Sequence, residues 1–410
     1  MTRSAELSDT RTGGSDRLDR LRARLNDRWI ALGVPLLLIY ARVVEGMVVS
    51  EHQLTLVRLA GFDSAHPSGS QGPLVNLEHW DAQWYHSIAS HGYVSGPDAA
   101  FYPGYPLVSA LLHRVSFGAV STNAALFIVS WGSLVGLALI FESFCRRMDI
   151  NRNLSFVTLF VTLFGPGSCF LISWYPLSLF LLLSCVTFVY LAKGQEWTAA
   201  VVAGAATSLS PVAVALSIAL AIRFLFRRGP ATLTTRLAKS TLSVWGIVAY
   251  YAYCQVRYGS LLEPVRAQKD WYVKAIVPFT YLPTMVHSLF SEHFDRATFV
   301  SLGLNLLCEA VALALIVRLA VRLARREVTG DQRTFSVFTI ASLVIPAATV
   351  VPYATTFRAE GFARLSGASV GFNVEAVRGM RGRATLTTFA LLWFLLGLMG
   401  QILFSGGWFT

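Results

Sequence analysis

Charge is scarce in this sequence. Only 14% of its 410 residues are Asp, Glu, Lys or Arg, whereas about a quarter of the residues in soluble domains are charged. Hydrophobic residues make up 54% of the chain, and the mean hydropathy is +0.54. This balance excludes an ordinary water-soluble globular protein, and it predicts that most of the chain is embedded in a lipid bilayer.

Cysteine is also scarce, and the five cysteines show no CxxC or CxxxH spacing. They lie within or at the ends of apolar runs, at Cys145, Cys169, Cys185, Cys254 and Cys308. This placement is typical of small core side chains. It argues against both a disulfide framework and a zinc site.

The sequence has no single continuous basic patch, although Lys and Arg exceed Asp and Glu by 34 to 23. The arginines instead cluster at the ends of apolar runs. A nucleic-acid partner would require a basic face, so we expect none and attribute the charge to membrane topology.

Long apolar runs are abundant, and about 20 apolar residues suffice to cross a bilayer. We expect spans near 29–49, 122–144, 154–171, 174–192, 197–226, 240–257, 297–317, 334–356 and 385–405. Ser208, Ser210 and Pro211 should break the 197–226 run into a kinked span or a hairpin of two half-spans. The stretch 361–378 is too polar to face lipid, but it could pack inside the bundle. The predicted fold class is an all-α polytopic membrane protein.

Arginine is distributed unevenly about the predicted spans. Several arginines lie within 17–28, before the first span, whereas residues 50–112 contain only Arg58 among Lys and Arg. The positive-inside rule therefore places the N-terminus in the cytoplasm and the first loop outside. If the 197–226 run enters and returns, the later clusters also fall inside: Arg146/Arg147/Arg152, Arg227/Arg228/Arg236/Lys239 and Arg318/Arg322/Arg325/Arg326.

This topology divides the chain into a tail and one membrane domain. Residues 1–28 are polar and form a predicted disordered or juxtamembrane tail. Residues 29–410 form the transmembrane domain, with a first outer loop at 50–121 and a second at 258–296. The eight histidines all fall in or beside these two loops. Polar chemistry is therefore expected on the outer face.

The first outer loop carries an amphipathic helical pattern over 77–90 that stops at His91 and Gly92. At 3.6 residues per turn, one face of this helix holds a carboxylate among apolar and aromatic side chains: Asp81, Trp84, Tyr85 and Ile88. Such a carboxylate at the lipid–water boundary is a candidate general base. The alternative is an interfacial aromatic belt in which Asp81 is solvated or caps the helix. Asp98, in the following loop, is a second candidate carboxylate.

Two ordered motifs lie in this loop: WDAQWYHSIASHGY over 80–93 and AFYPGYP over 100–106. They resemble the signature of the PIG-V-like mannosyltransferases, which include GPI mannosyltransferase II and bacterial relatives. The segment GSLLEPVRAQKDW over 259–271 is similar to a further element of the bacterial members. With the number and order of the spans, the resemblance covers most of the chain.

The resemblance implies a GT-C-type helix bundle whose catalytic aspartate lies in the first outer loop, at Asp81. It implies that mannose is transferred from a polyprenyl-phosphate donor to a lipid-linked or cell-envelope glycan acceptor on the outer face. Asp81 would act as general base, and cations would stabilise the leaving lipid phosphate. Arg266, Lys269, Arg358 and Arg364 are the candidate cations, and ordinary interfacial snorkelling is the alternative role for each. The membrane would be a bacterial plasma membrane, or the endoplasmic reticulum of a eukaryote.

The candidate binding residues are aromatic, polar or basic residues within these motifs: Trp80, Trp84, Tyr85, His91, Tyr102, Tyr105, Arg266, Gln268, Lys269, Trp271 and Arg364. Membrane lipids are expected partners. His79 and His86 are two helical turns apart and lack a third ligand on their face, so the spacing does not indicate a metal. A divalent metal is left open, and no other cofactor is expected.

Three segments depart from the family pattern. SWYPLS at 173–178 lacks the glutamate of the corresponding family segment, SLSP at 208–211 replaces more polar residues, and 364–367 matches only loosely. These departures keep a non-catalytic scaffold in cell-envelope assembly open. A lipid or solute transporter would share the hydropathy and the broken helix. Transporters, however, collect their polar groups near the midplane of the membrane, whereas here the polar groups are expected in the two outer loops.

Overall fold

The computed structural model describes residues 33, 36–45, 47–48, 77–78, 80–226, 231–292, 294, 296–353, 356–359, 369–380 and 382–406. The predicted tail at 1–28, most of the first loop before residue 77, His79 and Arg364 lie outside the described residues. The predictions made for them stay predictions.

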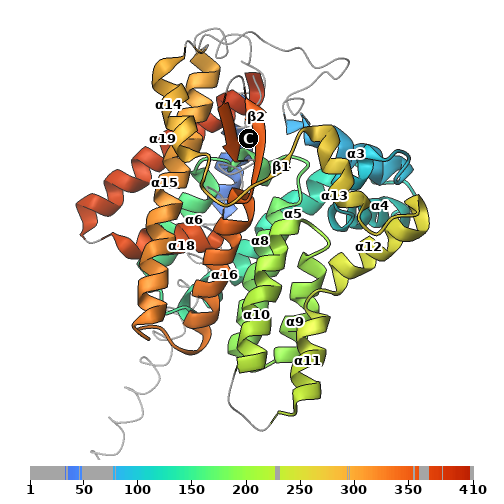
Figure 1. Cartoon of the computed structure of the whole chain (residues 1–410), viewed down its shortest axis with the longest axis horizontal. Helices are drawn as coiled ribbons and strands as arrows, with labels where there is room; N and C mark the ends of the chain where they lie inside the picture. The colour runs from blue at the N-terminus through green and yellow to red at the C-terminus, as the bar shows by residue number, and fades with distance from the viewer. Residues whose placement is uncertain are drawn as a thin grey trace, which may run out of the picture.

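The described part of the chain is almost entirely helical, which confirms the all-α class (Figure 1). The longer helices are α5 (Thr122–Arg147), α6 (Arg152–Phe164), α8 (Leu177–Ala192), α12 (Trp245–Tyr258), α15 (Arg296–Ala324), α16 (Gly330–Ala347) and α19 (Arg383–Gly406). By length and composition, three segments could each cross a membrane as one helix: Thr122–Arg147, Phe299–Ala324 and Arg383–Ile402. Shorter apolar helices at Arg152–Phe164, Leu177–Ala192 and Pro211–Phe226 coincide with other predicted spans.

The 197–226 run is a hairpin of two half-spans, as one of the two sequence alternatives predicted. Helix α9 (Glu196–Ala206) ends before the Ser-Leu-Ser-Pro break, and α10 (Val214–Phe226) follows the short turn η3 (Pro211–Ala213). At the open end of the hairpin, the start of α9 and the end of α10 both contact α11 (Leu233–Leu242). Lys239 Nζ lies 2.8 Å from Glu196 Oε2, and Arg236 donates to the Leu225 carbonyl at 3.4 Å. The break therefore lies at the opposite end of the hairpin, beside the cavity described below.

The C-terminal third decides an open alternative for the described part of 361–378, and it differs from the prediction at one span. Helix α18 (Val370–Gly379) packs inside the bundle, and its residues from 370 to 377 are buried. The predicted span at 334–356, however, stops at Ala347, because the helix gives way to the β-branched run Thr349-Val350-Val351. Strand β2 (Thr349–Tyr353) pairs antiparallel with β1 (Lys274–Ala275) and β3 (Thr356–Ala359). This small sheet, which includes Arg358 on β3, joins the 258–296 segment to the bundle.

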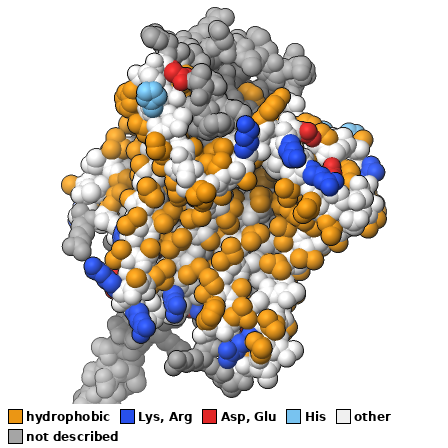
Figure 2. All heavy atoms as spheres, in the orientation of Figure 1, with side chains coloured by type: hydrophobic (Ala, Val, Ile, Leu, Met, Phe, Trp, Pro, Cys, Tyr) orange, Lys and Arg blue, Asp and Glu red, His pale blue; other side chains and the backbone are white. Residues whose placement is uncertain are grey.

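The surface agrees with a membrane environment. Figure 2 shows hydrophobic side chains over the centre of one face, whereas Lys and Arg gather at its lower end and at its upper right. The lower end in this view holds α11 and the adjoining ends of α9 and α10. An apolar band between two charged ends is the pattern expected of a bundle that spans a bilayer.

Candidate active site

Helix α3 (Asp81–His91) begins at the motif aspartate, four residues later than the amphipathic pattern indicated. Its apolar face does not lie against lipid, because Tyr85 and Ile88 are buried in the protein core. The residue before it, Trp80, has φ 61° and ψ −127°, a conformation that non-glycine residues rarely adopt. Asp81 is therefore held, partly buried, at the start of a helix whose apolar face packs against the protein.

The loop after α3 is held by its own hydrogen bonds. Asp98 is 5% exposed, and its Oδ2 accepts from the backbone N–H groups of Val94 and Ser95, both at 2.7 Å. The Tyr93 hydroxyl donates to the Phe101 carbonyl at 2.6 Å, and burial raises the pKa of Tyr93 well above its usual value. The second candidate carboxylate, Asp98, thus has a structural role in this turn.

The AFYPGYP turn is docked onto the hairpin break. The Gly104 N–H donates to the Ser208 carbonyl at 2.7 Å. On the other side of the turn, the Tyr250 hydroxyl of α12 donates to the Ala99 carbonyl at 2.8 Å. The 100–106 motif and the 208–211 break, far apart in sequence, therefore form one wall.

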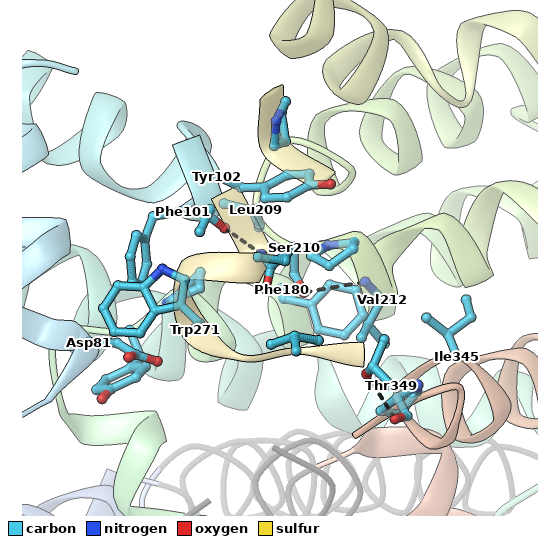
Figure 3. Close-up of a pocket in the computed structure, with 18 of the residues that line it drawn as sticks. Asp81, Phe101, Tyr102, Phe180, Leu209, Ser210, Val212, Trp271, Ile345 and Thr349 are labelled. Carbon is cyan, nitrogen blue, oxygen red and sulfur yellow. Dashed lines mark hydrogen bonds between the residues drawn. The ribbon is translucent and has the colours of Figure 1, made fainter. Parts of the chain in front are cut away.

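A cavity of about 360 Å³ opens between α3, this wall, the 264–273 segment and the start of β2. Aromatic and polar side chains surround Asp81 at one end, and Ile345 and Thr349 lie at the other, as Figure 3 shows. The lining residues are Asp81, Tyr85, Ala100, Phe101, Tyr102, Tyr175, Pro176, Leu177, Phe180, Leu209, Ser210, Pro211, Val212, Tyr251, Pro264, Val265, Gln268, Trp271, Val273, Ile345, Pro346, Thr349 and Val351. Asp81 is the one charged residue of this described set.

Aromatic contacts hold three segments around Asp81. The Trp84 ring stacks on Phe101 with centroids 5.4 Å apart, and Trp271 meets Trp84 edge-on at 5.2 Å. Tyr85 contacts Tyr175 at 6.0 Å. Such pairs contribute about 0.5–1.5 kcal/mol each beyond area burial. Within the described residues, the buried Trp271 Nε1 has no hydrogen-bond partner, which makes it a candidate donor to a ligand.

The structure brings part of the predicted site together. Asp81, Tyr85, Tyr102, Gln268 and Trp271 line the cavity. Gln268 also donates to the Ala100 carbonyl at 3.4 Å, which links η4 (Gln268–Trp271) to the AFYPGYP turn.

Other predicted residues lie outside the set that lines the cavity. Trp84 supports Phe101, and Tyr105 is fully buried with its hydroxyl donating to the Leu126 carbonyl at 2.8 Å. His91 is exposed at the end of α3. Arg266 and Lys269 are exposed on α13 (Glu263–Ala267) and η4, the same segments that supply Gln268 and Trp271.

The sequence prediction missed two segments that line the cavity. Tyr175, Pro176 and Leu177 belong to the 173–178 segment, and 209–212 belongs to the hairpin break. Both segments depart from the family pattern, and this departure was the sequence signal that could have marked them as part of the site. Their position beside Asp81 follows from helix packing.

The histidines of α3 give no sign of a metal centre. His86 stacks on Trp174 at 5.5 Å, and burial lowers its pKa. Among the described residues, no three His, Cys, Asp or Glu side chains gather as a ligand set.

Comparison with known proteins agrees with the motifs. Residues 38–256 match the model of the family described as mannosyltransferase (PIG-V). The human GPI alpha-1,6-mannosyltransferase 2 is 30% identical over 148 residues, which is 34% of this chain and 30% of the human protein. The rat protein of the same name is 28% identical over 144 residues, which is 32% of this chain and 29% of the rat protein. The chain thus aligns with about a third of each relative's length. Because the family match covers more than half of the residues, the chain belongs to the PIG-V mannosyltransferase family.

Proposed function

We propose that this protein transfers mannose from a polyprenyl-phosphate donor to a hydroxyl group of a lipid-linked or cell-envelope glycan on the outer face of the membrane. The observation that carries the proposal is the position of Asp81. It comes from the motif shared with the mannosyltransferases, and it lines a cavity whose other described lining residues are uncharged.

In the proposed reaction, the acceptor hydroxyl oxygen attacks the anomeric carbon of mannose. The bond between that carbon and the phosphate oxygen breaks, and its electron pair stays on the phosphate. Asp81 accepts the hydroxyl proton as the new bond forms, because an alcohol is a weak nucleophile until its proton is removed. The aromatic rings of Tyr85 and Trp271 suit the apolar faces of a sugar.

The remote end of the cavity supports a lipid donor. Ile345 lies there, and Phe180, Val212 and Val351 add further apolar lining to the cavity; burying an isoprenoid chain against such side chains is favourable by roughly 25 cal/mol per Å². A carrier lying along these side chains would present its phosphate toward the 264–273 segment and its sugar toward Asp81.

The direct test incubates membranes containing the purified protein with polyprenyl-phosphate-mannose, radiolabelled in the mannose, and a panel of lipid acceptors. We expect label to move from the donor to an acceptor lipid. Failure with every polyprenyl-phosphate donor would favour the scaffold alternative over the enzyme.

Arg266→Ala is expected to raise the KM for the donor by several-fold and to change the KM for the acceptor little. The substitution removes the guanidinium group that would make a charge-assisted contact with the phosphate of the lipid donor. Arg266 is 64% exposed, and its NH1 lies 3.9 Å from Glu263, so the substitution should disturb the fold little.

A matched control for this variant is Arg146→Ala. Arg146 is 73% exposed, and its NH2 lies 3.8 Å from Glu142 on α5. It makes the same kind of surface ion pair but lies away from the cavity, so its donor KM should stay at the wild-type value. Equal weakening of donor and acceptor by Arg266→Ala would count against the proposed phosphate position.

Cysteine labelling tests the outer-face assignment. The five native cysteines are buried in the described structure, so a membrane-impermeant thiol reagent should react selectively with an introduced cysteine. Ser70→Cys, in the first loop, should be labelled from outside intact cells. Ala231→Cys, exposed before α11, should be labelled only after the membrane is opened. The reverse pattern would overturn the topology and the outer-face reaction together.

A further inference from the structure

The last turn of α19 is bonded to two distant parts of the chain. Gln401 Oε1 accepts a hydrogen bond from Arg42 NH2 at 2.7 Å. The Phe404 carbonyl accepts one from Trp80 Nε1 at 3.1 Å. Residues 401 and 404 are about one helical turn apart. One turn therefore binds both the helical segment at 36–45 and the residue that precedes Asp81.

Each of these hydrogen bonds gives a partner to a polar group that is buried or lies at a helix end. The last four carbonyls of a helix have no intrahelical donor, and the Trp80 indole supplies one to Phe404. Arg42 is 1% exposed and Gln401 is fully buried. A buried guanidinium is tolerated only with polar partners, and here the partners are Gln401 and Glu45, whose Oε2 lies 2.5 Å from Arg42 NH1. The contact between 36–45 and α19 is therefore specific.

Trp80, the first residue of the 80–93 motif, carries backbone strain directly before Asp81. Its φ of 61° is unusual for a bulky residue, and such strain persists only where the surroundings hold it in place. The direction of the chain at Trp80 sets where α3 starts, and thus where the Asp81 carboxylate points. Phe404 also packs on Phe170 at 5.0 Å and on Tyr175 at 6.2 Å, and Tyr175 lines the same cavity.

We propose that the last turn of α19 positions Asp81, with Trp80 acting through Phe404 and Arg42 acting through Gln401 as positioning residues. This inference rests on the proposed role of Asp81 as general base. Trp80 was predicted above as a binding residue. In this proposal its indole N–H instead donates to the Phe404 carbonyl within the protein and does not contact the substrate.

The first test compares Trp80→Phe with Trp245→Phe. Both substitutions remove an indole donor bonded to a helix carbonyl, since Trp245 Nε1 donates to the Val201 carbonyl at 3.0 Å. A displacement of about 1 Å can cost up to about 100-fold in rate. We expect Trp80→Phe to lower kcat by about 10- to 100-fold and to leave the KM for the donor and the KM for the acceptor within about twofold of wild type. Trp245→Phe should leave kcat unchanged.

The second test uses Gln401→Met, which removes the acceptor for Arg42, and Gln401→Glu, which restores one. The Met variant should lose kcat as Trp80→Phe does, and the Glu variant should recover most of it. Amide hydrogen exchange in residues 81–91 provides a readout that needs no activity. It should speed up in Trp80→Phe and Gln401→Met and stay slow in Trp245→Phe.

The outcomes separate the two proposals. Unchanged kcat and unchanged exchange in α3 for Trp80→Phe and Gln401→Met would overturn the positioning role, even if Asp81→Asn is inactive. An increase in KM without loss of kcat would also overturn it. If Asp81→Asn is fully active, the general-base role fails by itself, and the exchange measurement still decides whether α19 holds α3.

Discussion

Asp81→Asn is expected to lower kcat for mannosyl transfer by about 10²- to 10⁴-fold, the usual cost of losing a general base. Asparagine keeps the volume and much of the hydrogen bonding of aspartate, but it cannot accept the acceptor's proton at neutral pH. The measurement is initial-rate kinetics on purified protein with labelled donor, normalised to the folded fraction.

The same variant separates catalysis from helix capping. Asp81 is the first residue of α3, where a carboxylate stabilises the helix by about 0.3–1 kcal/mol. If that were its whole role, Asp81→Asn would be slightly less stable and would keep its kcat. A folded Asp81→Asn protein that transfers mannose at the wild-type rate would therefore refute the general-base assignment.

Asp98→Asn is the matched control. Asp98 lies in the loop that follows α3 and accepts two backbone N–H bonds, so its substitution should reduce stability and leave kcat per folded molecule unchanged. A large loss of kcat there would move the assignment toward Asp98.

The sequence was informative where local chemistry decides the structure. Pro211 and the serines before it cannot continue a helix smoothly, so the hairpin break could be predicted, and α9 and α10 flank it. The polar stretch before residue 378 could not face lipid, and α18 is buried accordingly. The motif aspartate lines the cavity, and its role as general base stays a prediction.

The sequence was less informative where several segments meet. Amphipathicity indicated a face with Tyr85 and Ile88, but it could not tell whether lipid or protein covers that face; the core of the bundle covers it. The distance in sequence between Trp80 and Phe404 hides their hydrogen bond. Likewise, the β2 strand forms only because β1 and β3 supply partners on either side.

Gly104→Ala is expected to destabilise the protein by about 1–3 kcal/mol, the usual cost of overpacking. A Cβ on Gly104 would clash with Ser208 Oγ and lie 2.9 Å from the Ser208 carbonyl oxygen. That carbonyl accepts the Gly104 N–H at 2.7 Å, so the clash and the hydrogen bond compete for the same position. The AFYPGYP turn must then move away from the hairpin break.

This movement should also lower activity, because the two segments together form one wall of the cavity. Tyr102 precedes Gly104, and Leu209 and Ser210 follow Ser208. Thermal unfolding in detergent gives the stability change, and donor and acceptor kinetics give the change at the site. The control is Gly132→Ala on α5, where an added Cβ meets nothing within 4 Å and alanine favours the helix. In the Gly104→Ala background, Ser208→Gly removes the hydroxyl and should restore part of the stability. Equal stability and activity in Gly104→Ala and Gly132→Ala would show that the turn and the break do not depend on this close approach.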